Sequence, residues 1–150
     1  MGTLGSSYTP NPIQAKRIAT FVKHHSPIDA LAKYASAVRA FYSHSQILEK
    51  WLTLTYDEPS NAFVIALDDL VNASDLTVTL VSSMDLETKT NVKNIVQPTF
   101  SYSKDTGVLS IHPANVSYKN YENAFLLTAK VLNLNLVYSL IYNTRASAST

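Results

Sequence analysis

Apolar residues in the first third of the chain recur at helical spacing. Asn11 and Pro12 form a helix-start pair, and the apolar residues after them predict a helix over residues 12–24. Ser26 and Pro27 repeat this signal before a second helix over residues 27–42. Its apolar positions are three and four apart: Ile28, Leu31, Ala35, Val38 and Tyr42. A third helix is predicted over residues 46–55, either continuous with the second or separated from it by residues 43–45. One face of it would carry Leu48, Trp51, Leu52 and Thr55.

Two later regions show the period-two alternation of half-buried strands. Residues 76–82 alternate and are rich in β-branched residues, so they predict a strand. Residues 99–103 and 108–112 flank a short polar segment that ends in Gly107. This arrangement predicts a β-hairpin in which Gly107 takes a positive φ.

The remaining segments are compatible with more than one structure. Residues 62–71 have helical spacing, but the apolar run within them also suits a buried strand, and periodicity does not separate the two. Residues 83–96 predict a helix with acids early and lysines late. Residues 121–130 also predict a helix. Residues 132–142 alternate with period two, which favours a strand, although a helical pattern fits them as well.

Together these elements predict an α+β protein, in which a helical N-terminal half is followed by a small antiparallel sheet with one or two helices. We expect a flexible N-terminal arm over residues 1–11, a single globular domain over 12–143, and a flexible tail over 144–150. No apolar run approaches the length of about 20 residues that a transmembrane helix needs. No basic segment followed by an apolar one marks a secretory signal peptide at the start.

Composition excludes several kinds of chemistry. The chain has no cysteine, which removes disulfides, thiol nucleophiles and cysteine–zinc sites. Only three glycines occur, at positions 2, 5 and 107, so glycine-rich phosphate loops and nucleophile elbows are absent. The histidines show no metal-ligand spacing, and we expect neither a metal nor a cofactor. Asp68 and Asp69 are adjacent, so they are poor acid–base partners and fit a solvated turn or helix face better.

The distribution of charge is more informative than its sum. The net charge is +1, and charged residues make up only 15% of the chain, which favours self-association. Residues 57–87 carry seven acids and no base, whereas the segments before and after them are basic. Such blocks suit head-to-tail assembly if they occupy different faces. They also fit a subunit in which the segments pack together and neutralise one another.

Two surface signals remain. The first six residues fit the N-myristoylation pattern, which makes Gly2 a candidate lipid attachment site, although a pattern this short also arises by chance. A basic cluster on the first helix could supply the second membrane signal that a single acyl chain needs. The N-terminal half also offers candidate contacts for phosphates or an anionic surface: Lys16, Arg17, Lys23, Lys33 and Arg39. Phe100 and Tyr102, near Lys104, could stack on bases but are better explained by core packing.

These observations favour a non-enzymatic structural protein that self-assembles through protein–protein interaction into a homo-oligomer, such as a small viral coat or matrix-like subunit. Its location would be intracellular or in a virion. The alternative is a nucleic-acid-binding module whose basic helices contact the phosphates of RNA or DNA. An enzyme with a dispersed active site is a third hypothesis, which sequence spacing does not exclude.

Overall fold

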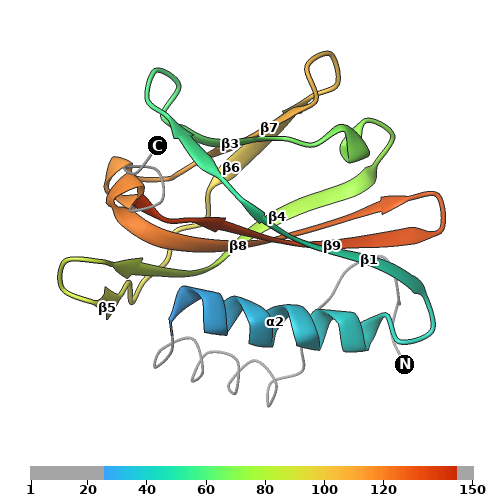
Figure 1. Cartoon of the computed structure of the whole chain (residues 1–150), viewed down its shortest axis with the longest axis horizontal. Coiled ribbons are helices and arrows are strands. Elements are labelled where there is room, and N and C mark those ends of the chain that lie inside the picture. Colours follow the sequence, from blue (N-terminus) through green and yellow to red (C-terminus); the bar gives the residue numbers. More distant parts are fainter. Residues whose placement is uncertain (1–25, 145–150) are drawn as a thin grey trace.

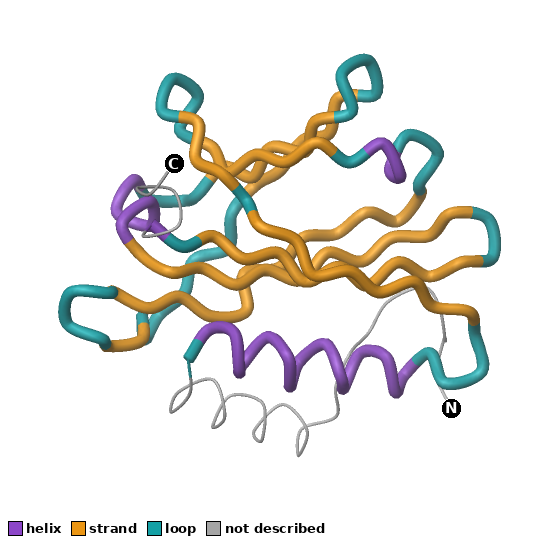
Figure 2. Tube along the Cα trace, viewed as in Figure 1, coloured by secondary structure: helices purple, strands orange, loops and turns teal. Residues whose placement is uncertain are grey.

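The computed structural model describes residues 26–144, and this part of the chain is mostly β (Figures 1 and 2). It contains one α-helix, nine strands in two sheets, and two short 3₁₀ helices. The predicted α+β fold with a helical N-terminal half is therefore wrong. The elements in chain order are α2 Pro27–Phe41, β1 Gln46–Thr53, β2 Thr55–Asp57, β3 Ala62–Ala66, η1 Asp68–Leu70, β4 Ser74–Asp85, β5 Thr90–Asn91, β6 Thr99–Ser103, β7 Val108–His112, η2 Val116–Asn120, β8 Tyr121–Val131 and β9 Leu134–Tyr142.

The described residues form three layers, which Figure 1 shows from the side. The middle layer is a five-stranded sheet in the order β1-β9-β8-β4-β5, in which β1 runs parallel to β9 and the other neighbours are antiparallel. Helix α2 covers one face of this sheet. The second sheet, with the antiparallel order β2-β3-β7-β6, covers the other face.

Each face of the middle sheet has its own hydrophobic core. The core beneath α2 is the smaller one and is built around Leu31, Ala35 and Val38 from the helix and Val81, Leu126 and Val137 from the sheet. The larger core lies between the two sheets. Its largest fully buried side chains are Tyr138, Phe63 and Phe125. Burial of this apolar surface is the main favourable term that holds the three layers together.

One bent segment belongs to both sheets. β1 ends at Thr53 and β2 begins at Thr55, so only Leu54 separates them. The Leu54 amide still donates to the Ile141 carbonyl of β9 at 2.8 Å, after which the chain pairs with β3 instead. The segment over residues 46–57 thus crosses from the middle sheet to the second sheet, as the diagonal strand in Figure 1 shows.

Helix α2 forms as its sequence predicts, but it ends at Phe41, one residue before the predicted end. Ser26 caps it by accepting a hydrogen bond from the Asp29 amide at 3.2 Å, and Pro27 occupies the first helical position. Leu31, Ala35 and Val38 are buried, but Ile28 of the predicted seam is 44% exposed. The helix predicted over residues 12–24, the arm over 1–11 and nearly all of the 144–150 tail lie outside the described residues.

Three predicted helices are strands or loops. Residues 46–55 form β1 and the start of β2, and residues 121–130 lie in β8. The helix over 83–96 is wrong as well, since these residues hold the end of β4, all of β5 and a loop. β8 lies at the centre of the middle layer and is buried on both faces, so its sequence lacks the alternation that marks a half-exposed strand.

The β predictions for the rest of the chain are closer. The hairpin strands over 99–103 and 108–112 match β6 and β7 residue for residue, and Gly107 has φ +73°. The strand over 76–82 lies within β4, and the favoured strand over 132–142 matches β9 from Leu134. The ambiguous segment over 62–71 divides into strand β3 and the 3₁₀ helix η1.

Candidate functional site

The structure places only two of the predicted surface contacts. Gly2, Lys16, Arg17 and Lys23 lie outside the described residues. Lys33 and Arg39 are both on α2. Lys33 is exposed, whereas the Arg39 guanidinium forms a 3.0 Å ion pair with the Glu49 carboxylate of β1. The described residues therefore bring no basic cluster of the predicted set together.

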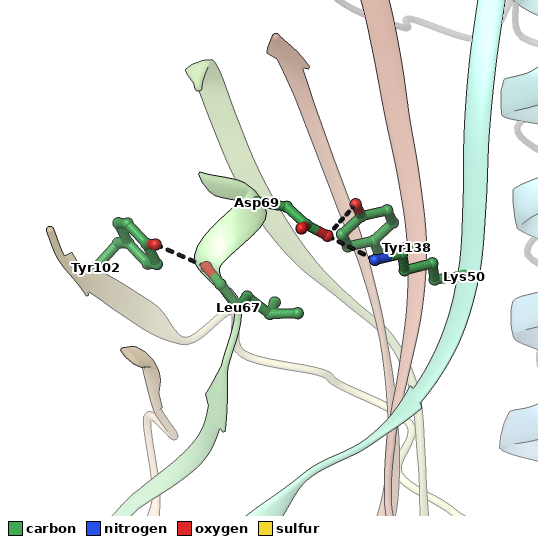
Figure 3. Close-up of polar contacts among 5 residues, drawn as sticks. All are labelled: Lys50, Leu67, Asp69, Tyr102 and Tyr138. Carbon is green, nitrogen blue, oxygen red and sulfur yellow. Dashed lines mark hydrogen bonds and ion pairs between the residues drawn. The ribbon is translucent and has the colours of Figure 1, made fainter. Parts of the chain in front are cut away.

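Asp68 and Asp69 are both exposed on the short helix η1, as predicted, but the Asp69 carboxylate is also engaged by side chains of the middle sheet. The Asp69 carboxylate accepts a hydrogen bond from the Lys50 ammonium of β1 at 2.6 Å and one from the Tyr138 hydroxyl of β9 at 2.8 Å (Figure 3). The Lys50 ammonium also lies 5.4 Å from the centre of the Tyr138 ring. Residues 19 and 69 positions from Asp69 along the chain thus converge on it, a juxtaposition that no sequence spacing indicated.

These contacts fix the protonation states in the cluster. The hydrogen bonds from Lys50 and then Tyr138 hold the pKa of the Asp69 carboxyl below its ordinary value. Burial, followed by the hydrogen bond to Asp69, raises the pKa of the Tyr138 phenol above its ordinary value. The phenol therefore stays protonated and donates to a stable carboxylate. The hydrogen bond between Asp69 and Tyr138 holds η1 against the middle sheet, and neither group changes its protonation state near neutral pH.

A tight turn positions η1 for this contact. The Leu67 amide donates to the Gly107 carbonyl at 2.7 Å, and the Tyr102 hydroxyl donates to the Leu67 carbonyl at 2.6 Å (Figure 3). A Cβ at Gly107 would lie 2.5 Å from a side-chain oxygen of Asp68. Gly107 therefore serves both the hairpin turn and the close approach of η1. Phe100 and Tyr102 pack against the larger core, so they do not form an exposed stacking platform.

Metal ligands, a pocket and a membrane-spanning helix are the other features that could point to a function in residues 26–144. Within them, no three histidine or acidic side chains gather as metal ligands would. The recess between the sheets near Phe63, Val96 and Tyr118 has no room for a water molecule. No helix in this range is long and apolar enough to cross a membrane.

The outer edge of β1 is the feature that offers an interaction surface. β1 is the terminal strand of the middle sheet, and among the described residues only β9 pairs with it. The Leu54 amide points toward β9, so the even-numbered residues of this strand face β9. The peptide groups that point away from the sheet then belong to Ile47, Glu49, Trp51 and Thr53.

Large apolar side chains accompany these outward peptide groups. Trp51 is 49% exposed and Leu48 is 36% exposed. Successive side chains alternate, so Trp51 lies on the α2 face together with Glu49, and Leu48 lies on the face that carries Lys50. The tie from Lys50 to Asp69 stabilises this edge strand from the second-sheet side, and the ion pair from Glu49 to Arg39 does so from the helix side.

Because a helix was predicted over residues 46–55, the exposed edge of β1 was not expected from the sequence. Period-two apolar positions are present in the same residues at Leu48, Leu52 and Leu54, interrupted by Lys50, and they were the available signal for a strand. Comparison of the chain with models of protein families, with curated proteins and with solved structures finds no match in any of the three.

Proposed function

We propose that this protein is a non-enzymatic structural subunit that self-assembles, such as a small viral coat or matrix-like protein, and that its main partner is another copy of itself. The observation that carries the proposal is the outer edge of β1. Its outward peptide groups have no strand partner among residues 26–144, and Trp51 and Leu48 beside them are exposed. An edge of this kind invites pairing with another chain.

The charge pattern and the polar cluster support the same proposal. A net charge of +1 gives little repulsion between copies. The Lys50–Asp69–Tyr138 cluster holds its proton donors and acceptors in stable pairs, which suits a structural role better than acid–base catalysis. Of the two candidate nucleic-acid contacts within residues 26–144, Arg39 is engaged by Glu49 and Lys33 is exposed.

Size-exclusion chromatography with light scattering tests the proposal, run over a range of protein concentrations at low and high salt. We expect a mass above the 16.5 kDa of one chain that rises with concentration, and an absorbance ratio at 260 and 280 nm typical of protein alone. A monomer at every concentration would overturn the proposal. A ratio typical of bound nucleic acid, with binding lost at high salt, would favour the nucleic-acid-binding alternative instead.

A further inference from the structure

We infer that two copies of this chain pair through β1 in antiparallel orientation about a two-fold axis at Lys50, so that the middle sheet continues from one copy into the other. This inference rests on the proposed self-assembly and specifies its surface and register. The occupant of the β1 edge is a second copy of β1 itself.

The choice of edge follows from a comparison of the open strands. The second sheet ends in β2, which has three residues, and in β6, which has five and whose exposed positions carry only hydroxyl side chains: Thr99, Ser101 and Ser103. At the other end of the middle sheet, the two residues of β5 pair only with Met84 and Asp85 of β4, and the Gln97 side chain bonds both the amide and the carbonyl of Leu80 farther along that edge. β1 has eight residues and exposes Leu48 and Trp51. It therefore offers the most main-chain hydrogen bonds and the most apolar surface of these strands.

Symmetry selects the orientation. A two-fold axis perpendicular to the sheet relates two edge strands in antiparallel orientation and keeps each face of the sheet on the same side. The α2 layers of both copies then lie on one side, and the second sheets lie on the other. A parallel pairing would turn one copy over and place the helix layer of one beside the second sheet of its neighbour. The antiparallel arrangement therefore extends all three layers.

The number of paired residues selects the register. The four outward residues of β1 are Ile47, Glu49, Trp51 and Thr53. When the axis passes through Lys50, each of the four lies opposite an outward residue of the partner, and each such pair exchanges two main-chain hydrogen bonds. Moving the axis by one residue to Glu49 or Trp51 leaves one of the four without a strand partner. The shift to Glu49 also places two carboxylates opposite each other, which is unfavourable.

The side-chain pairs that this register places opposite each other are compatible with it. On the second-sheet face, the exposed Leu48 of one copy lies opposite the half-buried Leu52 of the other. Glu49 lies opposite Trp51 on the helix face. The two Lys50 side chains meet at the axis, but each is already bonded to an Asp69 carboxylate at 2.6 Å. Their mutual repulsion is thereby reduced.

Disulfide trapping tests the register directly, because the chain contains no cysteine of its own. Glu49→Cys and Trp51→Cys are prepared as separate single variants, checked for folding by circular dichroism, and oxidised alone or as an equal mixture after subunit exchange. Hydrogen-bonded antiparallel pairs have Cα atoms about 5.5 Å apart, within disulfide range. We expect a covalent dimer from the mixture and little from either variant alone.

Each other result contradicts the inference in an identifiable way. A covalent dimer from Glu49→Cys alone places the axis at Glu49, and one from Trp51→Cys alone places it at Trp51. No covalent dimer in any sample, although light scattering shows an oligomer, rejects the β1 edge while the proposed self-assembly stands. A monomer by light scattering rejects both.

A charge substitution provides an independent measurement with a matched control. Trp51→Lys places a charge at the paired edge and should raise the dissociation constant at least about tenfold, equivalent to about 1.4 kcal/mol. Leu132→Lys adds the same charge at another exposed apolar residue, in the turn between β8 and β9. It should leave the dissociation constant within about twofold. Equal effects from the two variants would overturn the assignment of the edge.

Discussion

The contact between Asp69 and Tyr138 should be measurable as a coupling free energy of folding. Tyr138 has no exposed surface, and its hydroxyl donates to the Asp69 carboxylate at 2.8 Å. Asp69→Ala removes that acceptor and leaves the phenol unsatisfied, which costs about 1–3 kcal/mol. It also removes the partly exposed ion pair to Lys50, worth about 0.2–1 kcal/mol. We therefore expect Asp69→Ala to lower the free energy of unfolding by about 2 kcal/mol.

The double-mutant cycle isolates the hydrogen bond. Tyr138→Phe keeps the buried ring and removes the donor, so it should cost about 1 kcal/mol by itself. In the Tyr138→Phe background no hydroxyl is left unsatisfied, and Asp69→Ala should then cost less than about 1 kcal/mol, the value of the ion pair alone. Urea denaturation of the four proteins at pH 7 gives the coupling. If Asp69→Ala costs the same in both backgrounds, Asp69 does not satisfy the Tyr138 hydroxyl.

The same cluster predicts how stability changes with pH. The folded state lowers the pKa of Asp69, so its contribution is complete above the ordinary value of 3.8 and is lost as the pH falls through the lower folded value. The folded state raises the pKa of Tyr138, so its contribution is lost as the pH rises above the ordinary value of 10.0. Tyr138→Phe should therefore weaken the loss of stability above pH 10, measured by urea denaturation. An unchanged alkaline limb would contradict the assignment.

Three further substitutions test the fold, each by thermal or urea denaturation. Gly107→Ala should destabilise by at least about 1–2 kcal/mol, because φ is +73° and the new Cβ would meet Asp68. Wild-type stability in this variant would mean that η1 does not approach the turn so closely. Ser82→Ala should leave stability unchanged or raise it by up to about 1 kcal/mol, because the buried Ser82 hydroxyl has no hydrogen-bond partner among the described residues. A loss above about 1 kcal/mol would reveal a partner. Leu132→Gly should stabilise by up to about 1 kcal/mol, because Leu132 has φ +56° and is 93% exposed. A clear loss would mean that the Leu132 side chain is engaged.

Sequence reasoning succeeded where local signals determine the structure. Helix α2 has its cap, its N1 proline and a buried stripe within one segment. The hairpin of β6 and β7 has a glycine at the position that needs a positive φ. Both elements are determined by residues that are near neighbours in the chain, which is the range over which propensity and capping act.

The failure at β8 has a clear physical cause, which is burial by residues far away in sequence. β8 has α2 on one face and the second sheet on the other, so residues such as Phe125, Leu126 and Leu127 are all buried. A run that is apolar at every position carries no period, and helix and strand cannot then be separated. The Lys50–Asp69–Tyr138 cluster could not be predicted from the sequence for a related reason. It depends on the pairing of β1 with β9, which are far apart in the chain.

Hydrogen exchange at the outer edge of β1 tests the central claim most directly. The amides of Ile47, Glu49, Trp51 and Thr53 point away from β9, so in an isolated copy they should exchange rapidly. Residue-resolved exchange is measured by NMR at low and high protein concentration, with the open edge of β6 as the internal control. We predict that protection of these four amides increases with concentration while the β6 edge does not change. Rapid exchange at the four positions at every concentration would contradict assembly through β1.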